Sequence, residues 1–350
     1  LDAGPGKDIT LAENGNDFQG PVSIISGKDV TLQDANALDL GASTISGALD
    51  VTAGGNITES GALTVAGNGS FTTAGGSDIL LASQPNDIAG EASFTASTGN
   101  INNLEFRNTN AGATLPSLGN VSNDVTIQFD NTAIDLPALT IGGDFDVTAG
   151  GNITDSGDIA VAGSGIFEAD GGAADITLGD TTNADFASLN LTGGNVTVSE
   201  DSATELSGVS AGSLNLSSAG AITDATSLDV TGAATFDAGG NDITLGDDAG
   251  DTTNFGSLEA SGNTVKITED SATDLAGGTT TTLTLSSAGA ITDSGPLNNT
   301  GTATLNADGG AADITLDEAG SSTGALDLTA AAATVDRDAA IEFGGGTVSS

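Results

Sequence analysis

The chain repeats one phrase four times, and this repeat restricts the folds that are open to it. The phrase GNITESGALTVAGNGSF begins at Gly55 and returns in related forms at Gly151, Gly220 and Gly289. The last three copies are evenly spaced, and the interval before them is longer. Self-similarity at a fixed period is typical of proteins that stack supersecondary units. We therefore interpret the chain as a repeat protein.

A shorter step of about 20–28 residues lies inside the long one. GKDITL at 6–11 returns one step later as GKDVTL at 27–32. Three such steps make a long unit of about 70 residues. We explain the longer interval between Gly55 and Gly151 by one additional step near Asp124. The segments of the type Asp/Asn–Ile/Val–Thr–Leu/Val, or variants of it, begin at Asp8, Asp29, Asn56, Asp78, Asn100, Asp124, Asn152, Asp175, Asn195, Ala221, Asp242, Thr264, Ala290 and Asp313.

Apolar and polar residues alternate within these segments. In the segment 242–245, Ile243 and Leu245 point one way while Asp242 and Thr244 point the other, which is the pattern of a half-buried strand. About three short strands per step, separated by Gly, Asn, Ser and Asp, predict an all-β fold. We predict a right-handed parallel β-helix, or β-solenoid, with 14–15 coils of about 21–28 residues. A β-sandwich is the less favoured alternative, because the turns lack a regular Asn-Gly hairpin signal.

We expect one elongated solenoid over residues 1–350. Its long units lie near 8–77, 78–174 (with the additional coil), 175–241 and 242–312, and a degenerate end covers 313–350. Because the pattern runs to both ends, we expect a segment of a longer chain.

The repeated phrase predicts its own packing. Ile57 and the pair Leu63/Val65 are expected to face the core, and the glycines at 54–55 are expected at a corner that needs positive φ or a close backbone approach. Once per long unit a large apolar residue is expected to fill the interior. These residues are Phe71, Phe167, Phe236 and Leu305.

The composition excludes several function classes. The chain has 48 acidic and 5 basic residues, a net charge of −43, so nucleic acid and anionic membranes should repel it. Cys and His are absent, which excludes disulfides, thiolate zinc sites and catalytic His pairs. High charge with few aromatic residues is also compatible with disorder, but the ordered spacing of the apolar residues argues against it. No apolar run is long enough to cross a membrane.

The phrase Gly-Asn/Ala-Ile-Thr-Asp/Glu-Ser-Gly, alternating with Gly-Gly-x-Asp-Ile-Thr-Leu, resembles the repeat region of filamentous-haemagglutinin-like bacterial exoproteins. The resemblance covers nearly the whole chain and is weakest at 100–140 and after 325. It implies a β-helix that is exported to the cell surface, often by two-partner secretion. The lack of Cys suits such a secreted protein.

No constellation predicts catalysis, so we expect no enzyme and no catalytic residues. The acidic positions keep the repeat, whereas an active site should interrupt it, and the few Lys and Arg residues form no cluster for polysaccharide cleavage. Calcium is the ligand that the acidic loops suggest, because stacked like charges favour a hard cation. The favoured interpretation is nevertheless a solvated acidic face, with calcium as the alternative. The candidate calcium ligands are Asp180, Asp185, Asp247, Asp248, Asp251, Glu269, Asp270 and Asp274.

The sequence therefore predicts a non-catalytic shaft segment of an extracellular bacterial adhesin or cell-surface filament that requires no cofactor. A calcium-dependent adhesive module is the alternative, and a polysaccharide-acting β-helix enzyme is a weaker one. The expected partners are neighbouring copies or the continuation of the same chain, because open strand edges recruit further strands. Any host or cell-surface ligand is expected to bind elsewhere in the full protein.

Overall fold

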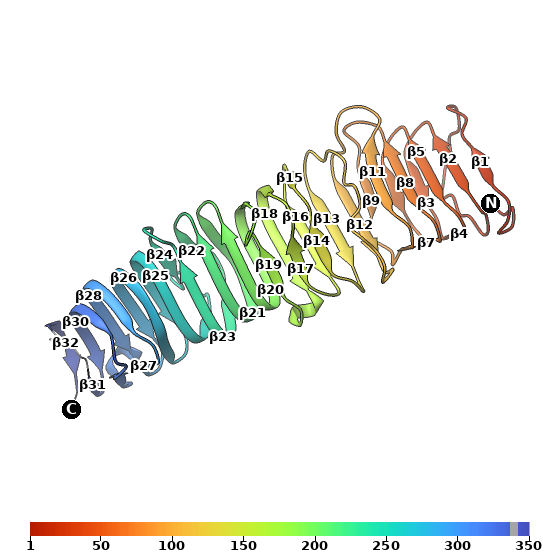
Figure 1. Cartoon of the computed structure of the whole chain (residues 1–350). Helices are drawn as coiled ribbons and strands as arrows, with labels where there is room; N and C mark the ends of the chain where they lie inside the picture. Colours follow the sequence, from red (N-terminus) through yellow and green to blue (C-terminus); the bar gives the residue numbers. More distant parts are fainter. Residues whose placement is uncertain (249, 337–341, 350) are drawn as a thin grey trace. The chain divides into compact units, whose positions relative to one another are not determined.

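The protein forms parallel β-coils throughout the part of the chain that the structure describes. The structure, a computed structural model, describes residues 1–248, 250–336 and 342–349. It divides into two compact units, Leu1–Ala174 and Asp175–Ser350. Within each unit, strands from successive coils lie side by side and pair in parallel (Figure 1). This is the β-solenoid that the sequence predicts. None of the described residues form a helix that is long and apolar enough to cross a membrane.

Three ladders of strands form the first unit, and we name them P, Q and R. Ladder P contains β3 (Leu38–Leu40), β6 (Ile57–Glu59), β9 (Ile79–Leu81), β12 (Leu104–Asn108), β13 (Val125–Phe129), β16 (Phe145–Ala149) and the end of β18 (Ile159–Ala169). Ladder Q contains β4 (Ser43–Ile45), β7 (Leu63–Val65) and β10 (Asp87–Ile88), and later β14 (Ile134–Leu136) and β17 (Ile153–Asp155). Ladder R contains β1 (Ile9–Leu11), β2 (Val30–Asp34), β5 (Leu49–Ala53), β8 (Gly69–Thr73) and β11 (Ala92–Ala96), and later β15 (Leu139–Ile141) and the start of β18.

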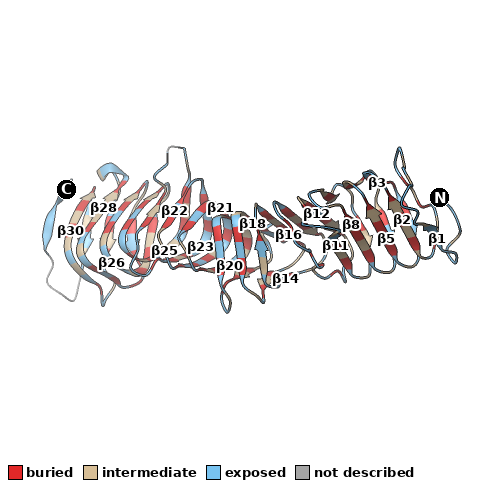
Figure 2. Cartoon of the chain, turned by 90° about the horizontal axis from the view of Figure 1, so that it is seen from above, coloured by how far each residue is buried: buried red, intermediate tan, exposed pale blue. Residues whose placement is uncertain are grey.

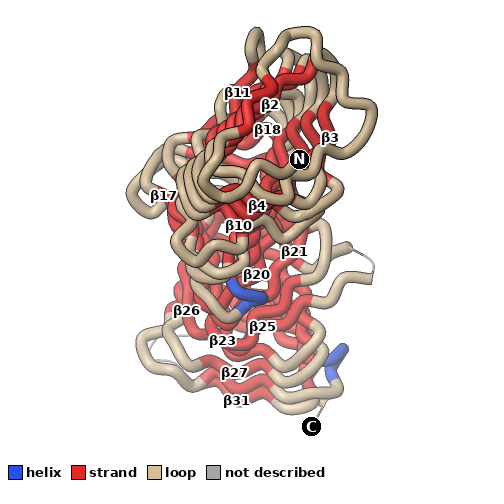
Figure 3. The backbone as a smooth tube through the Cα atoms, turned by 90° about the vertical axis from the view of Figure 1, so that its right-hand side faces the viewer, coloured by secondary structure: helices blue, strands red, loops and turns tan. Residues whose placement is uncertain are grey.

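The second unit has the same organisation, but several strands continue around corners. Its strands are β19 (Ile176–Leu178), β20 (Ala184–Glu200), β21 (Thr204–Ser218), β22 (Ile222–Asp224), β23 (Leu228–Asp237), β24 (Ile243–Leu245), β25 (Thr253–Glu269), β26 (Thr273–Ser287), β27 (Ile291–Asp293), β28 (Leu297–Ala307), β29 (Ile314–Leu316), β30 (Ser322–Ala330), β31 (Ala333–Val335) and β32 (Phe343–Val348). Two short 3-10 turns, η1 (Asp170–Gly172) and η2 (Asp308–Gly310), mark corners in the two units, and Figure 3 shows them in blue among the strands and loops.

Alternate residues of each strand fill the interior of the coil. Buried and exposed bands follow one another along the strands in Figure 2, and the residues of β2 read buried, intermediate, buried, intermediate, buried. Phenylalanines of neighbouring coils touch inside the core, as in Phe71 and Phe94, whose ring centres are 5.5 Å apart. The predicted interior positions are confirmed, because each of them is at most 1% exposed; they are Phe71, Phe167, Phe236 and Leu305.

Close approach between coils explains the corner glycines of the phrase. Neither Gly54 nor Gly55 has a positive φ. A Cβ at Gly54 would collide with the carbonyl oxygen of Ala35 in the preceding coil, and one at Gly55 would lie 3.1 Å from the backbone nitrogen of Ala37. Of the two reasons that the sequence offers, the backbone approach is therefore the one that applies.

The long unit makes three and one third coils, not three. From the start of one copy of the phrase to the start of the next, the chain of the second unit forms ten strand segments. Each coil contains three such segments. They begin at Ile222, Leu228, Ala234, Ile243, Thr253, Leu258, Val265, Thr273, Gly278 and Leu283, and the next copy begins at Ile291. Because coils are shorter than the steps read from the sequence, the described chain makes about 17 turns instead of the predicted 14–15.

Each copy of a repeated segment consequently lies one face further around the coil. Ile176 pairs with Val196, Ile243 pairs with Val265, and Ile314 pairs with Ala333, and these pairs belong to three different ladders of the second unit. The three copies of Asp-Ile-Thr-Leu therefore point in three directions.

Candidate functional site

Exposed acidic residues at corners join successive coils through the backbone. The carboxylate of Asp124 accepts a hydrogen bond from the Asp144 N–H at 2.9 Å, and Asp144 accepts one from the Ser164 N–H at 2.8 Å. Asp242 does the same for the Thr264 N–H at 2.9 Å. These bonds lower the pKa of the Asp242 carboxyl below its usual value. The Asp of Asp-Ile-Thr-Leu is thus a cap for the next coil, and we call these residues the corner caps.

A second set of acidic residues lies inside the corners. Their positions correspond to the last residue of the repeated Ile-Thr-Asp/Glu or to the end of a longer strand, and all are at most 9% exposed. Their carboxylates hold backbone N–H groups of neighbouring coils; that of Glu59 accepts from the Gln84 N–H at 2.8 Å, and that of Asp224 accepts from the Gly246 N–H at 3.0 Å. We call them the buried corner carboxylates: Asp34, Glu59, Asp155, Glu200, Asp224, Glu269 and Asp293.

Two of these carboxylates occupy equivalent places in successive copies of the sequence. Glu269 accepts hydrogen bonds from the Thr273 hydroxyl at 2.6 Å, the Ser271 hydroxyl at 3.0 Å and the Phe255 N–H at 3.0 Å. Glu200 accepts from the Phe186 N–H at 3.1 Å. The repeated letters Glu-Asp-Ser-Ala-Thr therefore encode a buried hydrogen-bonded corner.

Burial raises the pKa of four of the buried corner carboxylates, which is opposite to the shift at Asp242. Desolvation raises the pKa of Glu59, Glu200 and Glu269, although their hydrogen bonds oppose the shift. For Asp224, burial and the negative charges of Asp251 and Asp247 raise the pKa to about 6. Folding therefore favours the protonated form of these four carboxyl groups and the charged form of Asp242.

The candidate calcium ligands do not gather into one site. Within the described ranges, no group of three or more acidic side chains is placed to hold a metal ion. Several candidates already have partners: Asp247 lies 3.3 Å from the Lys266 ammonium, Asp185 accepts from the Ser202 hydroxyl, and Asp270 accepts from the Thr253 N–H. Asp274 accepts from the Ser294 hydroxyl, Glu269 is buried, Asp251 is half-buried, and Asp180 and Asp248 are exposed. Calcium binding stays a prediction, which melting with and without a chelator tests.

One coil of the first unit interrupts the regular stacking, and we call residues 104–124 the irregular coil. It has the strand β12 on ladder P, but its other two sides contain only the isolated bridges Ser93–Ser117 and Ile101–Val121. Ladder P continues through it to β13, whereas ladder Q stops at β10 and ladder R at β11. The additional coil that the sequence predicts near Asp124 stays a prediction.

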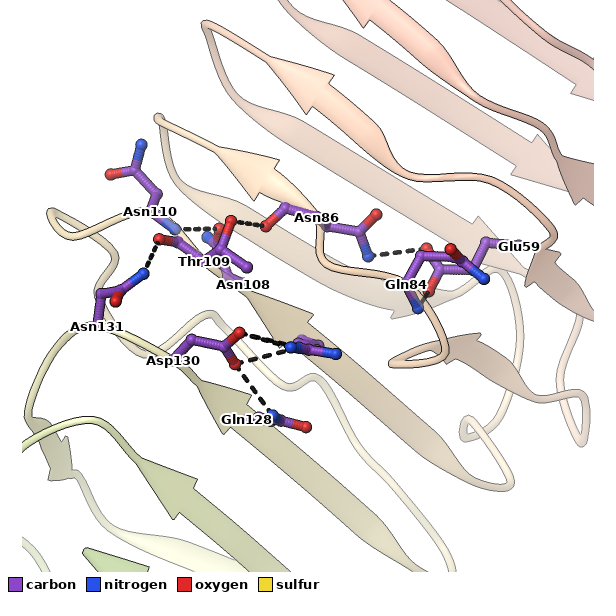
Figure 4. Close-up of polar contacts among 10 residues, drawn as sticks. Glu59, Gln84, Asn86, Asn108, Thr109, Asn110, Gln128, Asp130 and Asn131 are labelled. Atoms are coloured by element: carbon purple, nitrogen blue, oxygen red, sulfur yellow. Dashed lines mark hydrogen bonds and ion pairs between the residues drawn. The ribbon is translucent and has the colours of Figure 1, made fainter. Parts of the chain in front are cut away.

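Amide side chains replace the missing strand on one edge of the interruption. Asn108, 2% exposed, accepts a hydrogen bond from the Ile88 N–H at 3.1 Å and donates to the Ile88 carbonyl at 3.0 Å. Asn86, fully buried, donates to Glu59 at 2.7 Å and accepts from the Leu63 N–H at 2.9 Å. Figure 4 shows the hydrogen bonds of these residues and of those around them, from Glu59 to Asn131. These side chains satisfy backbone groups that a neighbouring strand would otherwise bind.

An ion pair fastens the irregular coil to the next one. The Arg107 guanidinium donates to both carboxylate oxygens of Asp130, and the shortest contact is 2.6 Å. Gln128 donates to the same carboxylate at 3.0 Å (Figure 4). The pair raises the pKa of Arg107, and both side chains are half-buried. A planar bidentate pair of this kind holds its geometry better than a Lys contact.

The sequence interpretation missed both buried sets of polar residues. A signal was present for the buried corner carboxylates, because the acidic residue of Ile-Thr-Asp/Glu occupies the inward place of the Leu in Asp-Ile-Thr-Leu. For Asn86 and Asn108 there was no repeated signal, since neither lies in a repeated segment.

Comparison with known proteins finds one repeat family. The family described as Repeats of unknown function (DUF5649) matches residues 1–25, 27–95, 122–192, 193–259 and 262–329. No curated protein and no solved structure matches the chain. The unmatched stretch 96–121 contains most of the irregular coil.

Proposed function

The chain belongs to the family of Repeats of unknown function (DUF5649), and we propose that it acts as a structural shaft segment of an extracellular bacterial adhesin or cell-surface filament. The proposed role is mechanical and non-catalytic. Export and surface location enter the proposal through the resemblance to filamentous-haemagglutinin-like exoproteins, and the repeat architecture supports the mechanical part.

The observation that carries the proposal is the number of independent connections between successive coils. Parallel ladders join them through the backbone, apolar residues pack between them, and the corner caps and buried corner carboxylates reach from one coil to the next. A unit joined in this way transmits load along its stack through every coil.

The surface chemistry agrees with a shaft that stays separate from its neighbours. A net charge of −43 opposes lateral association between copies. We propose that the axial partners are neighbouring copies or further coils of the same chain.

Changing the number of units tests the proposal. Three additional copies of the segment 222–290 add ten coils, which should lengthen the shaft by about 48 Å at about 4.8 Å per coil. Imaging the full protein with and without the insertion, with a tag on each side of the insertion point, measures this length. The proposal expects the full increase with surface display retained, and an unchanged separation of the tags would overturn it.

A second pair of variants separates a shaft from an adhesive module. Thr223→Ala and Thr284→Ala change exposed side chains and leave the core intact, whereas Ile243→Asp places a charge in the core. For a shaft, the two surface changes leave adhesion by the whole protein unchanged, and the core change abolishes display. Loss of adhesion in the folded surface variants would instead favour direct ligand binding by this segment.

A further inference from the structure

The strand edges on the two sides of the irregular coil differ in whether side chains cover their backbone groups. On its near side, the amide of Asn108 covers both backbone groups of Ile88 in β10. On its far side, β14 pairs only with β17, and β15 pairs only with β18, among the residues that the structure describes. An uncovered strand edge readily accepts another strand, and natural proteins usually protect such edges.

The hydrogen-bond pattern identifies the backbone groups that face the opening. In β14, the Ile134 N–H donates to the Asn152 carbonyl and the Leu136 carbonyl accepts from the Ser156 N–H, so these residues face β17. Successive residues of a parallel strand face opposite neighbours, and the N–H and C=O of Asp135 therefore face the irregular coil. By the same argument, the Leu139 N–H donates to the Asp158 carbonyl, and Thr140 presents its backbone groups to the opening.

Two cavities lie along this edge, and both belong to the first unit. One of about 440 Å³ lies between Ala113–Leu115 and the segment 132–137, and includes Asp135 and Pro137. The other, of about 420 Å³, lies between 118–121 and 138–141. Both are within the size range of ligand pockets. Ladder Q lacks one strand at this point, because β10 and β14 lie two coils apart with none between them.

Charge selects the kind of strand that would fit. Asp135 is exposed beside the open edge, and the whole chain carries a net charge of −43. Arg107 is already held by Asp130. Half-buried Leu115 and Leu139 line the two cavities and offer apolar contact to inward side chains. An extended segment with alternating basic and apolar residues would complement this edge.

We propose that the β14–β15 edge binds an extended, basic polypeptide segment of a partner protein by adding it as a strand beside the irregular coil. The backbone groups of Asp135 and Thr140 make the pairing, and the side chain of Asp135 contributes to the charge selection. This binding site is independent of the shaft role, which requires only the regular coils.

Amide hydrogen exchange of the whole chain tests the edge first. In the free protein, the amides of Asp135 and Thr140 should exchange at least tenfold faster than those of Thr154 and Ala160, which lie opposite them in β17 and β18. Equal protection of all four amides in the free protein would show that the edge is already closed, and the proposal would be wrong.

The second measurement adds a probe, a capped octapeptide of alternating Lys and Val. It should slow exchange at Asp135 and Thr140 at least tenfold at low salt. An octapeptide of alternating Glu and Val, and a Lys–Val peptide N-methylated at every second residue, should leave the exchange unchanged. Binding of the Lys–Val peptide without protection of these two amides would overturn the proposal, since charge alone would then account for it.

Two variants complete the test. Thr140→Pro removes an N–H that faces the opening and not the ladder, so the coil should fold while peptide protection at position 135 falls at least fivefold. Asp135→Asn should weaken peptide binding severalfold at low salt and keep the fold. The matched control is Asp229→Asn, because Asp229 is exposed in a strand that pairs on both sides. Equal weakening by Asp135→Asn and Asp229→Asn would contradict the assigned position.

Discussion

The side-chain amide of Asn108 binds the backbone of Ile88 as a strand would, since its oxygen accepts from the Ile88 N–H at 3.1 Å and its nitrogen donates to the Ile88 carbonyl at 3.0 Å. Both residues are buried, at 2% and 0% exposure. One side chain therefore closes the edge of β10 at the point where ladder Q is interrupted. Without it, two buried backbone groups would lack partners.

Replacing this amide should destabilise the first unit locally. Asn108→Ala leaves both backbone groups of Ile88 unsatisfied, at a cost of about 1–3 kcal/mol. We expect faster amide exchange at Ile88 and a lower unfolding midpoint in urea. Asn120→Ala, at an exposed position of the same coil, is the control and should change neither quantity. An Asn108→Ala protein with native exchange at Ile88 would refute the strand-like role.

The buried corner of Glu269 gives a prediction for the second unit. Glu269→Ala removes the acceptor of the Phe255 N–H and of two hydroxyls, and we expect a loss of about 1–3 kcal/mol in unfolding free energy. The control is Glu259→Ala, because Glu259 lies on the same strand at an exposed position. It should change the unfolding free energy by less than about 0.5 kcal/mol. Denaturation of both variants in urea measures the difference. Equal effects of the two substitutions would mean that the corner hydrogen bonds contribute nothing.

The opposite pKa shifts predict a stability maximum in mildly acidic solution. The pKa of Asp224 is about 6 in the folded protein against an ordinary value of 3.8, so between these values the folded state binds more protons than the unfolded state. The unfolding free energy must therefore decrease as the pH rises from about 4 to about 6. Glu59, Glu200 and Glu269 act in the same direction.

Below pH 4 the sign reverses. The pKa of Asp242 is lowered in the folded state, so its contribution is present above its ordinary value and is lost as the pH falls further. We expect the melting temperature to be higher near pH 5 than at pH 7 and to fall again in stronger acid. Asp224→Asn should reduce the rise between pH 7 and pH 5, while Asp229→Asn should preserve it. A melting temperature that falls steadily from pH 7 to pH 5 would contradict the assignment.

Deletion of one long unit tests whether its copies are structurally equivalent. Removing 222–290 joins equivalent positions, so the remaining coils should fold with residue 304 in the place of Thr235, the register partner of Asn215. In the Cys-free chain, the substitutions Asn215→Cys and Thr304→Cys should form a disulfide in the deletion variant, because paired strands bring Cα atoms within the roughly 4.4–6.8 Å that a disulfide spans. The same pair in the undeleted chain should remain reduced, since the two residues lie several coils apart and in different ladders. A disulfide in the undeleted chain alone would reverse this conclusion.

The sequence was sufficient for the architecture because the determinants are local and repeated. The alternation of Ile243, Thr244 and Leu245 identifies a strand wherever it occurs, and the interval between copies predicts stacking. The same reasoning placed Phe71 and Phe236 in the interior, where they are fully buried.

The predicted number of coils was wrong because the interval between repeats in the sequence does not indicate how many corners the chain makes within it. The ten strand segments of a long unit could not be counted from the sequence alone. Gly193 and Gly232, for example, look like loop residues but lie within the continuous strands β20 and β23. The buried acids were missed for a related reason. Asp224 and Glu269 look like surface charges until the inward place that they occupy is known. Asn108 has no repeated counterpart, and only the three-dimensional contact with Ile88 reveals its role.

The fractional third of a coil gives the repeat number a directional meaning. Adding or losing one copy of the long unit turns every later residue by about a third of a revolution, while three copies restore the original orientation. Variation in copy number therefore changes the length of the stack. It also changes, in steps of about a third of a turn, the direction in which the later residues face. Any partner that must reach one particular side of the molecule would tolerate changes of three units and fail with changes of one or two.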